Sequence, residues 1–345
     1  MEMEQIFEAF LETVPTLLII LIIAAALFLL SRGADILVNE AVSLSVRWGI
    51  PKMIIGATIV SLGTTLPEVS VSVAAAVGGQ PDIALGNAVG SIICDTSMII
   101  GIAALIRPLP VQRSLTDRQG WLHLGSAVLL VLVALPWSTI GQGLTQSGRV
   151  PQWSGVLFLL LLAIYLYWTV QRSRKISTPM ADKEEVFNHT DSSPTVLVIL
   201  KLLAGLVLII LSSRLLIPSV QVVALRAGIP KSIIAATLVA FGTSLPELST
   251  AINASRKGHG ELAIGNVIGA DILNVLFVVG ASAAVTRGGL QVPEHFYLFH
   301  FPVMLVVVIL FRFSLLSRSR TIGRLPGALL LLFYIAFVVI SYTMI

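Results

Sequence analysis

The chain has 345 residues, of which 56% are hydrophobic and 12% are charged, and its mean hydropathy is +0.95. A soluble domain carries roughly 25% charged residues, so this composition excludes a soluble globular protein and predicts a polytopic membrane protein in contact with the lipid bilayer. The formal net charge of +4 does not indicate a nucleic-acid partner, because the basic residues are scattered over many predicted loops. The single cysteine, Cys94, excludes an intrachain disulfide and a cysteine-based metal cage.

Ten apolar runs are predicted as membrane-spanning helices, which need about 20 mainly apolar residues each. The first run is expected to be retained as a helix, because the acidic start of the chain lacks the positive charge of a signal peptide. The runs cover residues 15–47, 51–77, 82–106, 120–135, 153–170, 194–225, 230–255, 261–285, 295–316 and 322–342. A polar stretch in the middle then divides the chain into an N-terminal five-helix unit (1–172), a loop (173–193) and a C-terminal five-helix unit (194–345).

The basic residues predict the orientation of these helices. If the N-terminus lies outside, 15 of the 22 Lys and Arg residues fall in cytoplasmic loops and four fall in outside loops. Cytoplasmic loops are enriched in Lys and Arg, so both termini are expected outside and the loop 173–193 in the cytoplasm. The protein is expected in the cell membrane, and the sequence leaves its oligomeric state open.

One six-residue motif occurs twice, as Gly-Thr-Thr-Leu-Pro-Glu at residues 63–68 and as Gly-Thr-Ser-Leu-Pro-Glu at residues 242–247. Each copy lies in an apolar run, where a charged residue costs about 3 kcal/mol on insertion scales. The proline has no N–H and clashes with the carbonyl four residues earlier, so predicted helices 2 and 7 should be broken. A broken helix that offers carbonyls, hydroxyls and a carboxylate has the ligand types of a hard-cation site. The competing interpretation is a proline kink whose glutamate faces a polar neighbour.

The repeat extends well beyond this motif. Residues 49–101 align with residues 228–280 without a gap, and 23 of the 53 positions are identical. Both copies contain a second motif, which begins Gly-Asn at residue 86 and at residue 265. Five predicted helices separate the starts of the two copies, and because five is odd the copies should have opposite orientations in the membrane. Inverted repeats with broken helices are typical of secondary transporters whose site lies near the midplane.

The two motifs bring together oxygen-bearing side chains from both repeats. Asp95 in the first repeat corresponds to Asn274 in the second, and Asp271 corresponds to Ile92. Calcium takes 6–8 oxygen ligands and sodium also prefers oxygen, whereas soft metals would require grouped Cys or His. The five histidines are expected at helix ends or in loops, at the membrane interface or in water. The candidate cation ligands are Glu68, Glu247, Asp95, Asp271, Thr64, Thr65, Thr243, Ser244, Ser91, Asn274, Asn87 and Asn266.

The paired Gly-Thr-Ser/Thr-Leu-Pro-Glu and Gly-Asn-x-x-Gly-Ser/Ala motifs resemble the alpha-repeats of the sodium/calcium exchanger family, within the calcium/cation antiporters. The resemblance covers both repeats and the ten-helix layout. It implies that Glu68 and Glu247 are the central calcium ligands. It also implies sodium and calcium contacts, partly through backbone carbonyls, from the hydroxyl-bearing residues Thr64, Thr65, Thr243, Ser244 and Ser91.

The chain departs from the family pattern in three respects. The family commonly has Asn at the position of Asp95 and often Asp at that of Asn274, so acid and amide are exchanged between the repeats. Ala270 stands where a serine ligand is common, and Asp271 replaces a usual asparagine. Asp271 therefore competes with Asp95 as the third carboxylate of the site, and the number of exchanged sodium ions stays open.

The predicted function is a secondary antiporter that exchanges calcium for sodium by alternating access, with no cofactor beyond the transported ions. Four acids in one cavity repel one another, so cation binding should compete with protons, and a calcium/proton antiporter is the nearest alternative. A cation channel is a further alternative, although inverted repeats with broken helices favour a transporter. An enzyme is not expected, because the sequence contains no His-Glu-x-x-His or Gly-x-Ser-x-Gly motif.

Overall fold

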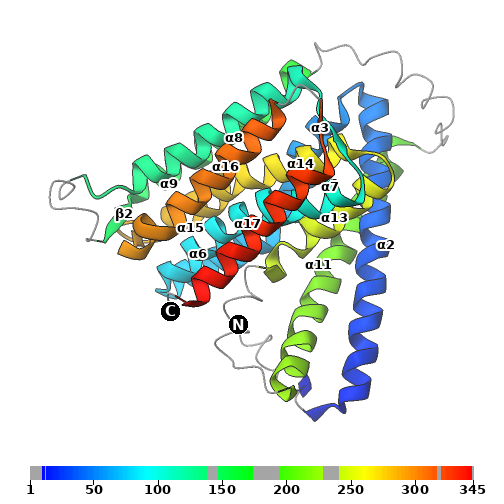
Figure 1. The fold of residues 1–345 in the computed structure, drawn as a ribbon, viewed down its shortest axis with the longest axis horizontal. Helices are drawn as coiled ribbons and strands as arrows, with labels where there is room; N and C mark the ends of the chain where they lie inside the picture. Colours follow the sequence, from blue (N-terminus) through cyan, green and yellow to red (C-terminus); the bar gives the residue numbers. More distant parts are fainter. Residues whose placement is uncertain are drawn as a thin grey trace.

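The computed structural model describes residues 10–11, 13–137, 147–173, 194–227, 241–316 and 320–343. These residues form helices, joined at two places by pairs of very short strands (Figure 1). Almost all of the predicted loop 173–193 lies outside the described residues, and so does most of the first half of predicted helix 7, at residues 228–240. The first repeat is therefore seen completely, and the second from residue 241 onward.

Seven described helices are long and apolar enough to cross a membrane, and a bent pair forms an eighth candidate. Their ends agree closely with the predicted runs. They are α2 (Thr16–Trp48), α6 with η2 and α7 (Pro81–Cys94, Asp95–Ile99, Ile100–Ile106), α9 (Gln152–Ser173), α11 (Thr195–Arg226), α14 with η4 and α15 (Gly260–Leu273, Asn274–Val279, Gly280–Val285), η5 with α16 (Phe296–His300, Phe301–Leu315) and α17 (Arg324–Thr343). An all-helical polytopic membrane protein is thereby confirmed.

The predicted break in helix 2 is present. The first half consists of α3 (Lys52–Ile55), η1 (Gly56–Val60) and α4 (Ser61–Thr64), and the second half is α5 (Leu66–Val77). The two halves meet at an angle of 44°. In the second repeat, α13 (Leu245–Arg256) begins at the equivalent position, with proline in its first turn. Proline is favoured in the first turn of a helix, because the N–H groups there have no hydrogen-bond partner within the helix and the missing N–H of proline costs nothing.

The helix α8 (Arg113–Ala134) begins at Arg113, whereas the apolar pattern predicted a start at Gly120. Its first two turns carry charged side chains that interrupt the apolar run. Arg312 of α16 compensates one of them, because its guanidinium lies 3.1 Å from Oδ1 of Asp117. Such a contact between distant parts of the chain is invisible to a periodicity argument, so the predicted boundary was wrong by nearly two turns.

Several helices contain a π-helical turn, in which each residue bonds to the fifth before it. Two of these turns start at symmetry-related positions: η2 begins at Asp95 and η4 begins at Asn274. A π-helical turn inserts one residue into the helical register and is frequent at functional sites. It therefore changes which side chains of each helix face the same neighbour, and the sequence pattern did not predict it.

Glycines allow the helices to approach closely where the repeats meet. A Cβ on Gly56 would lie 2.5 Å from the carbonyl oxygen of Leu262, and one on Gly269 would lie 2.6 Å from Cα of Ala57. The broken helix of the first repeat thus packs backbone to backbone against α14. The long helices α2 and α11 pack in the same way through Gly33 and Gly205, and stand together at one side of the molecule (Figure 1).

Two short strand pairs connect loops that are distant in sequence. The strand β1 (Leu109–Pro110) pairs with β4 (Thr321–Ile322), and β2 (Gly148–Val150) pairs with β3 (Leu290–Val292), both antiparallel. In addition, Lys257 just after α13 lies 2.7 Å from Oδ1 of Asp35 on α2. These contacts fix the ends of the helices that carry the candidate ligands.

Candidate cation site

The two motif glutamates lie in the first turns of α5 and α13 and are buried. Glu68 and Glu247 are each 1% exposed. Within the described part of the chain, none of their four carboxylate oxygens has a hydrogen-bond partner. Buried carboxylates are expensive unless they are paired or coordinate a cation. Both glutamates thus lie buried at the starts of the helices that follow the motif, and their role as cation ligands stays a prediction.

The two aspartates differ in their surroundings. Asp95 is 1% exposed, and neither of its carboxylate oxygens has a described hydrogen-bond partner. Asp271 is fully buried, and its Oδ2 accepts a hydrogen bond of 2.5 Å from the hydroxyl of Thr96. The same oxygen lies 2.9 Å from Nε2 of His123. Both oxygens of Asp95 therefore lack a described partner, whereas Asp271 is held through Oδ2 and only its Oδ1 lacks one.

The threonines of the broken helices cross from one repeat to the other. The hydroxyl of Thr243 donates to Oδ1 of Asn87 at 3.1 Å and also lies beside the carboxylate of Glu68. Its counterpart Thr64 lies 3.5 Å from Oδ1 of Asn266 and beside the carboxylate of Glu247. Each glutamate is thus approached by the threonine of the opposite repeat, as an inverted pair requires.

The remaining candidates surround the same space. Ser244 contacts Ser91 across the repeats at 3.4 Å and lies beside the carboxylate of Asp95. The Thr65 hydroxyl, Oδ1 of Asn274 and Nδ2 of Asn266 are buried without a hydrogen-bond partner among the described residues. All twelve predicted residues are buried, and the contacts above, together with the electrostatic interactions among the four acids, join all of them except Thr65 and Asn274 into one region between the repeats.

The acids are close enough to interact electrostatically. Glu68 interacts with Glu247 and Asp95, and Asp95 interacts with Glu247 and Asp271. Among the described residues, however, no three acidic, histidine or cysteine side chains converge tightly enough to hold a metal by themselves. A cation bound here would need hydroxyl, amide or backbone oxygens as well. That mixed, oxygen-only set suits calcium or sodium and disfavours soft transition metals.

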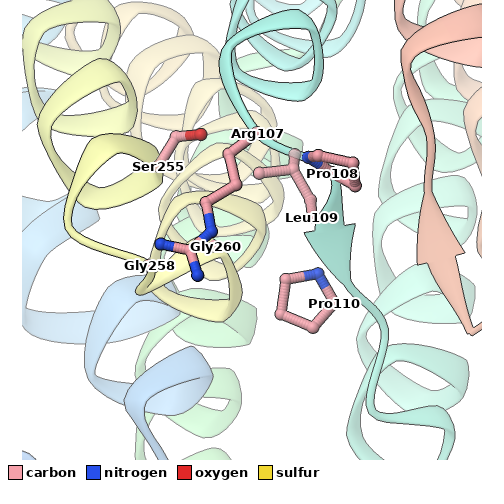
Figure 2. A pocket seen from close by; sticks show the side chains of 7 residues that line it. All are labelled: Arg107, Pro108, Leu109, Pro110, Ser255, Gly258 and Gly260. Atoms are coloured by element: carbon pink, nitrogen blue, oxygen red, sulfur yellow. The ribbon is translucent and has the colours of Figure 1, made fainter.

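Two cavities lie outside this buried region. One of about 470 Å³ lies between α2, α11 and α13 and has Gly242, the neighbour of Thr243, in its wall. The other, of about 210 Å³, lies between the segment from Arg107 to Pro110 and the turn from Ser255 to Gly260 (Figure 2). None of the twelve candidate residues lines either cavity. The four carboxylates themselves are buried, with at most 1% of each residue exposed.

One residue at the site was missed by sequence reasoning. His123 was expected near a helix end, at the membrane interface or in water, and that expectation is wrong: its side chain is 2% exposed and contacts Asp271. It lies in the part of α8 that follows the charged first turns, outside both repeated motifs. The only available signal was a histidine followed by a long apolar run, which is too common to identify a site.

The model of the sodium/calcium exchanger protein family matches residues 18–171 and 197–343, which is most of the chain and includes both repeats. The chain belongs to the sodium/calcium exchanger family. It is a cation exchanger in the membrane, and the resemblance inferred from the two motifs is confirmed.

Similar proteins match the exchanger over nearly its whole length. The inner membrane protein YrbG of Escherichia coli is 34% identical over 90% of this chain and 92% of its own. The sodium/calcium exchanger MaX1 of Methanosarcina acetivorans is 29% identical over 93% of this chain and 98% of its own. A solved structure of the sodium-calcium exchanger NCX_Mj superposes with a TM-score of 0.78, at 26% identity, over 93% of this chain and 98% of that one.

Proposed function

We propose that the exchanger is a secondary antiporter that moves calcium against sodium by alternating access. The observation that carries this proposal is the pair of buried glutamates at matched positions of the two repeats, with all four oxygens lacking a described hydrogen-bond partner. Two carboxylates that face one buried space repel each other unless a cation lies between them. One divalent ion or several monovalent ions can compensate the negative charge of the carboxylates. Because either can occupy the site, but not both at once, one kind of ion can be exchanged for the other.

The proposed calcium ligands are Glu68, Glu247 and Asp95, completed by oxygens of the hydroxyl and amide residues around them. Asp95 is preferred over Asp271 as the third carboxylate, because both of its oxygens lack a described partner. Thr64, Thr243 and Ser244 support the proposal since each lies beside one of these carboxylates. Sodium would use overlapping positions, including Thr65, Ser91, Asn87, Asn266 and Asn274.

The proposed architecture has ten membrane-spanning helices in two inverted five-helix repeats, with helices 2 and 7 broken at their prolines. The 44° bend at Thr65 and the start of α13 at Leu245 support this arrangement. Both termini are proposed to lie outside, from the distribution of Lys and Arg.

The test is calcium-45 uptake into proteoliposomes of the purified protein, with outward sodium and outward proton gradients imposed in separate experiments. We expect uptake under the sodium gradient that collapses when sodium is equal on both sides. Uptake driven by the proton gradient alone would replace sodium by protons as the exchanged ion. Calcium flux that needs no cation on the opposite side would indicate a channel and contradict the proposal.

A further inference from the structure

A histidine and an acid form a buried pair at the edge of the cation site. His123 on α8 is 2% exposed and Asp271 on α14 is fully buried, with 2.9 Å between Nε2 and Oδ2. Thr96 donates to the same carboxylate oxygen at 2.5 Å. On its other side, the imidazole packs edge to face against Phe311, with 6.0 Å between ring centroids. The pair is therefore held on several sides by neighbouring helices.

The pair has no counterpart in the other repeat. Asp271 corresponds by sequence symmetry to Ile92, so the second repeat carries one acid more at this position. Asp271 interacts electrostatically with Asp95 and Glu247, so an uncompensated charge here would act directly on the site. Histidine is a side chain that can carry one positive charge, and His123 lies within ion-pair distance of this one additional acid.

The other three acids have no such partner. Among the described residues, the carboxylates of Glu68, Glu247 and Asp95 have neither a hydrogen bond nor an ion pair with a basic side chain. We propose that His123 is a positioning residue that neutralises Asp271 and thereby leaves three carboxylates to set the charge of the cation site. This inference deepens the proposed function, on which it rests: it defines how much cationic charge the site accepts.

Two other roles compete with this one, and they differ in a double-variant cycle. If Asp271 were a direct ligand, Asp271→Asn would weaken cation binding, and changing His123 as well would not restore it. If His123 only filled space, its replacement would weaken binding whatever residue stood at 271. If the two form a neutralising pair, the single variants act in opposite directions and the double variant cancels them.

The experiment measures calcium binding by isothermal titration calorimetry on purified wild type, His123→Gln, Asp271→Asn and the double variant, in sodium-free buffer. Glutamine keeps a side chain of similar length with an N–H donor and removes the positive charge. We expect His123→Gln to tighten calcium binding and Asp271→Asn to loosen it, each by on the order of ten-fold. The double variant should return to within about three-fold of wild type.

The matched control is His295→Gln, because His295 is an exposed histidine at the start of the ninth predicted helix, and it should leave calcium affinity unchanged. Equal weakening in Asp271→Asn and in the double variant would overturn the inference, as would an unchanged or weakened affinity in His123→Gln. Sodium-driven uptake by the wild type is measured separately. If the wild type binds calcium but shows no sodium-driven uptake, the proposed exchange is contradicted, whereas the four binding affinities still test the role of His123. If the wild type binds no calcium, both the proposed function and this inference are overturned.

Discussion

The hydroxyl of Thr243 donates to the side-chain oxygen of Asn87 at 3.1 Å, and so joins the broken helix of the second repeat to the Gly-Asn motif of the first. Asn87 in turn donates to the hydroxyl of Ser72 at 2.9 Å and to the carbonyl of Glu68 at 3.3 Å. A single chain of hydrogen bonds thus runs from one repeat to the backbone of the glutamate in the other. Thr243 and Asn87, two of the proposed ion ligands, therefore also link the two repeats.

Loss of the Thr243 hydroxyl should therefore weaken calcium binding. We expect Thr243→Val to raise the calcium concentration for half-maximal uptake by about ten-fold, because it removes a buried hydrogen bond and an oxygen beside Glu68. The matched control is Thr250→Val on the same helix. Its buried hydroxyl bonds only to the Pro246 carbonyl in the described structure, so uptake should change little. Equal effects of the two substitutions would show that the Thr243 hydroxyl has no special role.

Asp95 is predicted to act as the third ionised carboxylate. Asp95→Asn should reduce calcium uptake by on the order of 100-fold, because a doubly charged ion loses a partner in a low-dielectric site. The double variant Asp95→Asn with Asn274→Asp should recover part of this loss, since it moves the charge to the symmetry-related position. Uptake assays on both proteins decide the question. Near-normal uptake by Asp95→Asn would make Asp95 a bystander.

The close contact at Gly56 predicts that alanine at this position destabilises the protein, although replacing glycine by alanine within a helix usually stabilises it. A methyl group there would lie 2.5 Å from the Leu262 carbonyl, so Gly56→Ala should lower the free energy of unfolding by ~1–3 kcal/mol. Gly125→Ala on α8 meets nothing within 4 Å and should be neutral or slightly stabilising, as alanine favours helix. Melting temperatures of the two purified proteins in the same detergent test this contrast. A stable Gly56→Ala protein would mean that the two helices can separate without cost.

Much of the fold was predictable, because lipid imposes simple rules on a chain. Apolar runs gave nearly all helix boundaries, and the broken helix at Pro67 followed from the missing N–H of proline. The start of α8 at Arg113 could not be predicted, because one of its charged side chains, Asp117, pairs with Arg312, which lies about 200 residues away in the sequence. The π-helical turns at Asp95 and Asn274 were likewise hidden, since they depend on packing rather than on composition.

The site was predictable where the two repeats mirror each other. Internal symmetry identified Glu68, Glu247 and the amides, and the structure places them in one buried region. Symmetry cannot identify a residue that has no mirror image. His123 lies outside the repeated segments, and its contact with Asp271 depends on how α8 packs against α14. Sequence reasoning also could not choose between Asp95 and Asp271, because their difference is one of hydrogen-bond partners.

The orientation in the membrane is testable by chemical labelling. Cysteines placed at the exposed Ser147 and at Ser177, which lies outside the described residues, should react from opposite sides in a Cys94→Ser background. Cys94 is buried, so its replacement removes a background signal without opening the surface. Ser147→Cys should react with an impermeant reagent on intact cells, and Ser177→Cys only after the membrane is opened. The reverse pattern would overturn the orientation derived from the basic residues.

The most direct test of the account is sodium-driven calcium-45 uptake by the Glu68→Gln and Glu247→Gln variants, compared with wild type in matched proteoliposomes. Glutamine keeps the size of the side chain and removes its charge, so each variant should remain folded and lose calcium exchange. Glu294→Gln, which changes an exposed glutamate near the ninth predicted helix, is the control and should exchange at the wild-type rate. The account predicts uptake at the level of empty liposomes for both motif variants. Near-normal exchange by either folded variant would contradict it.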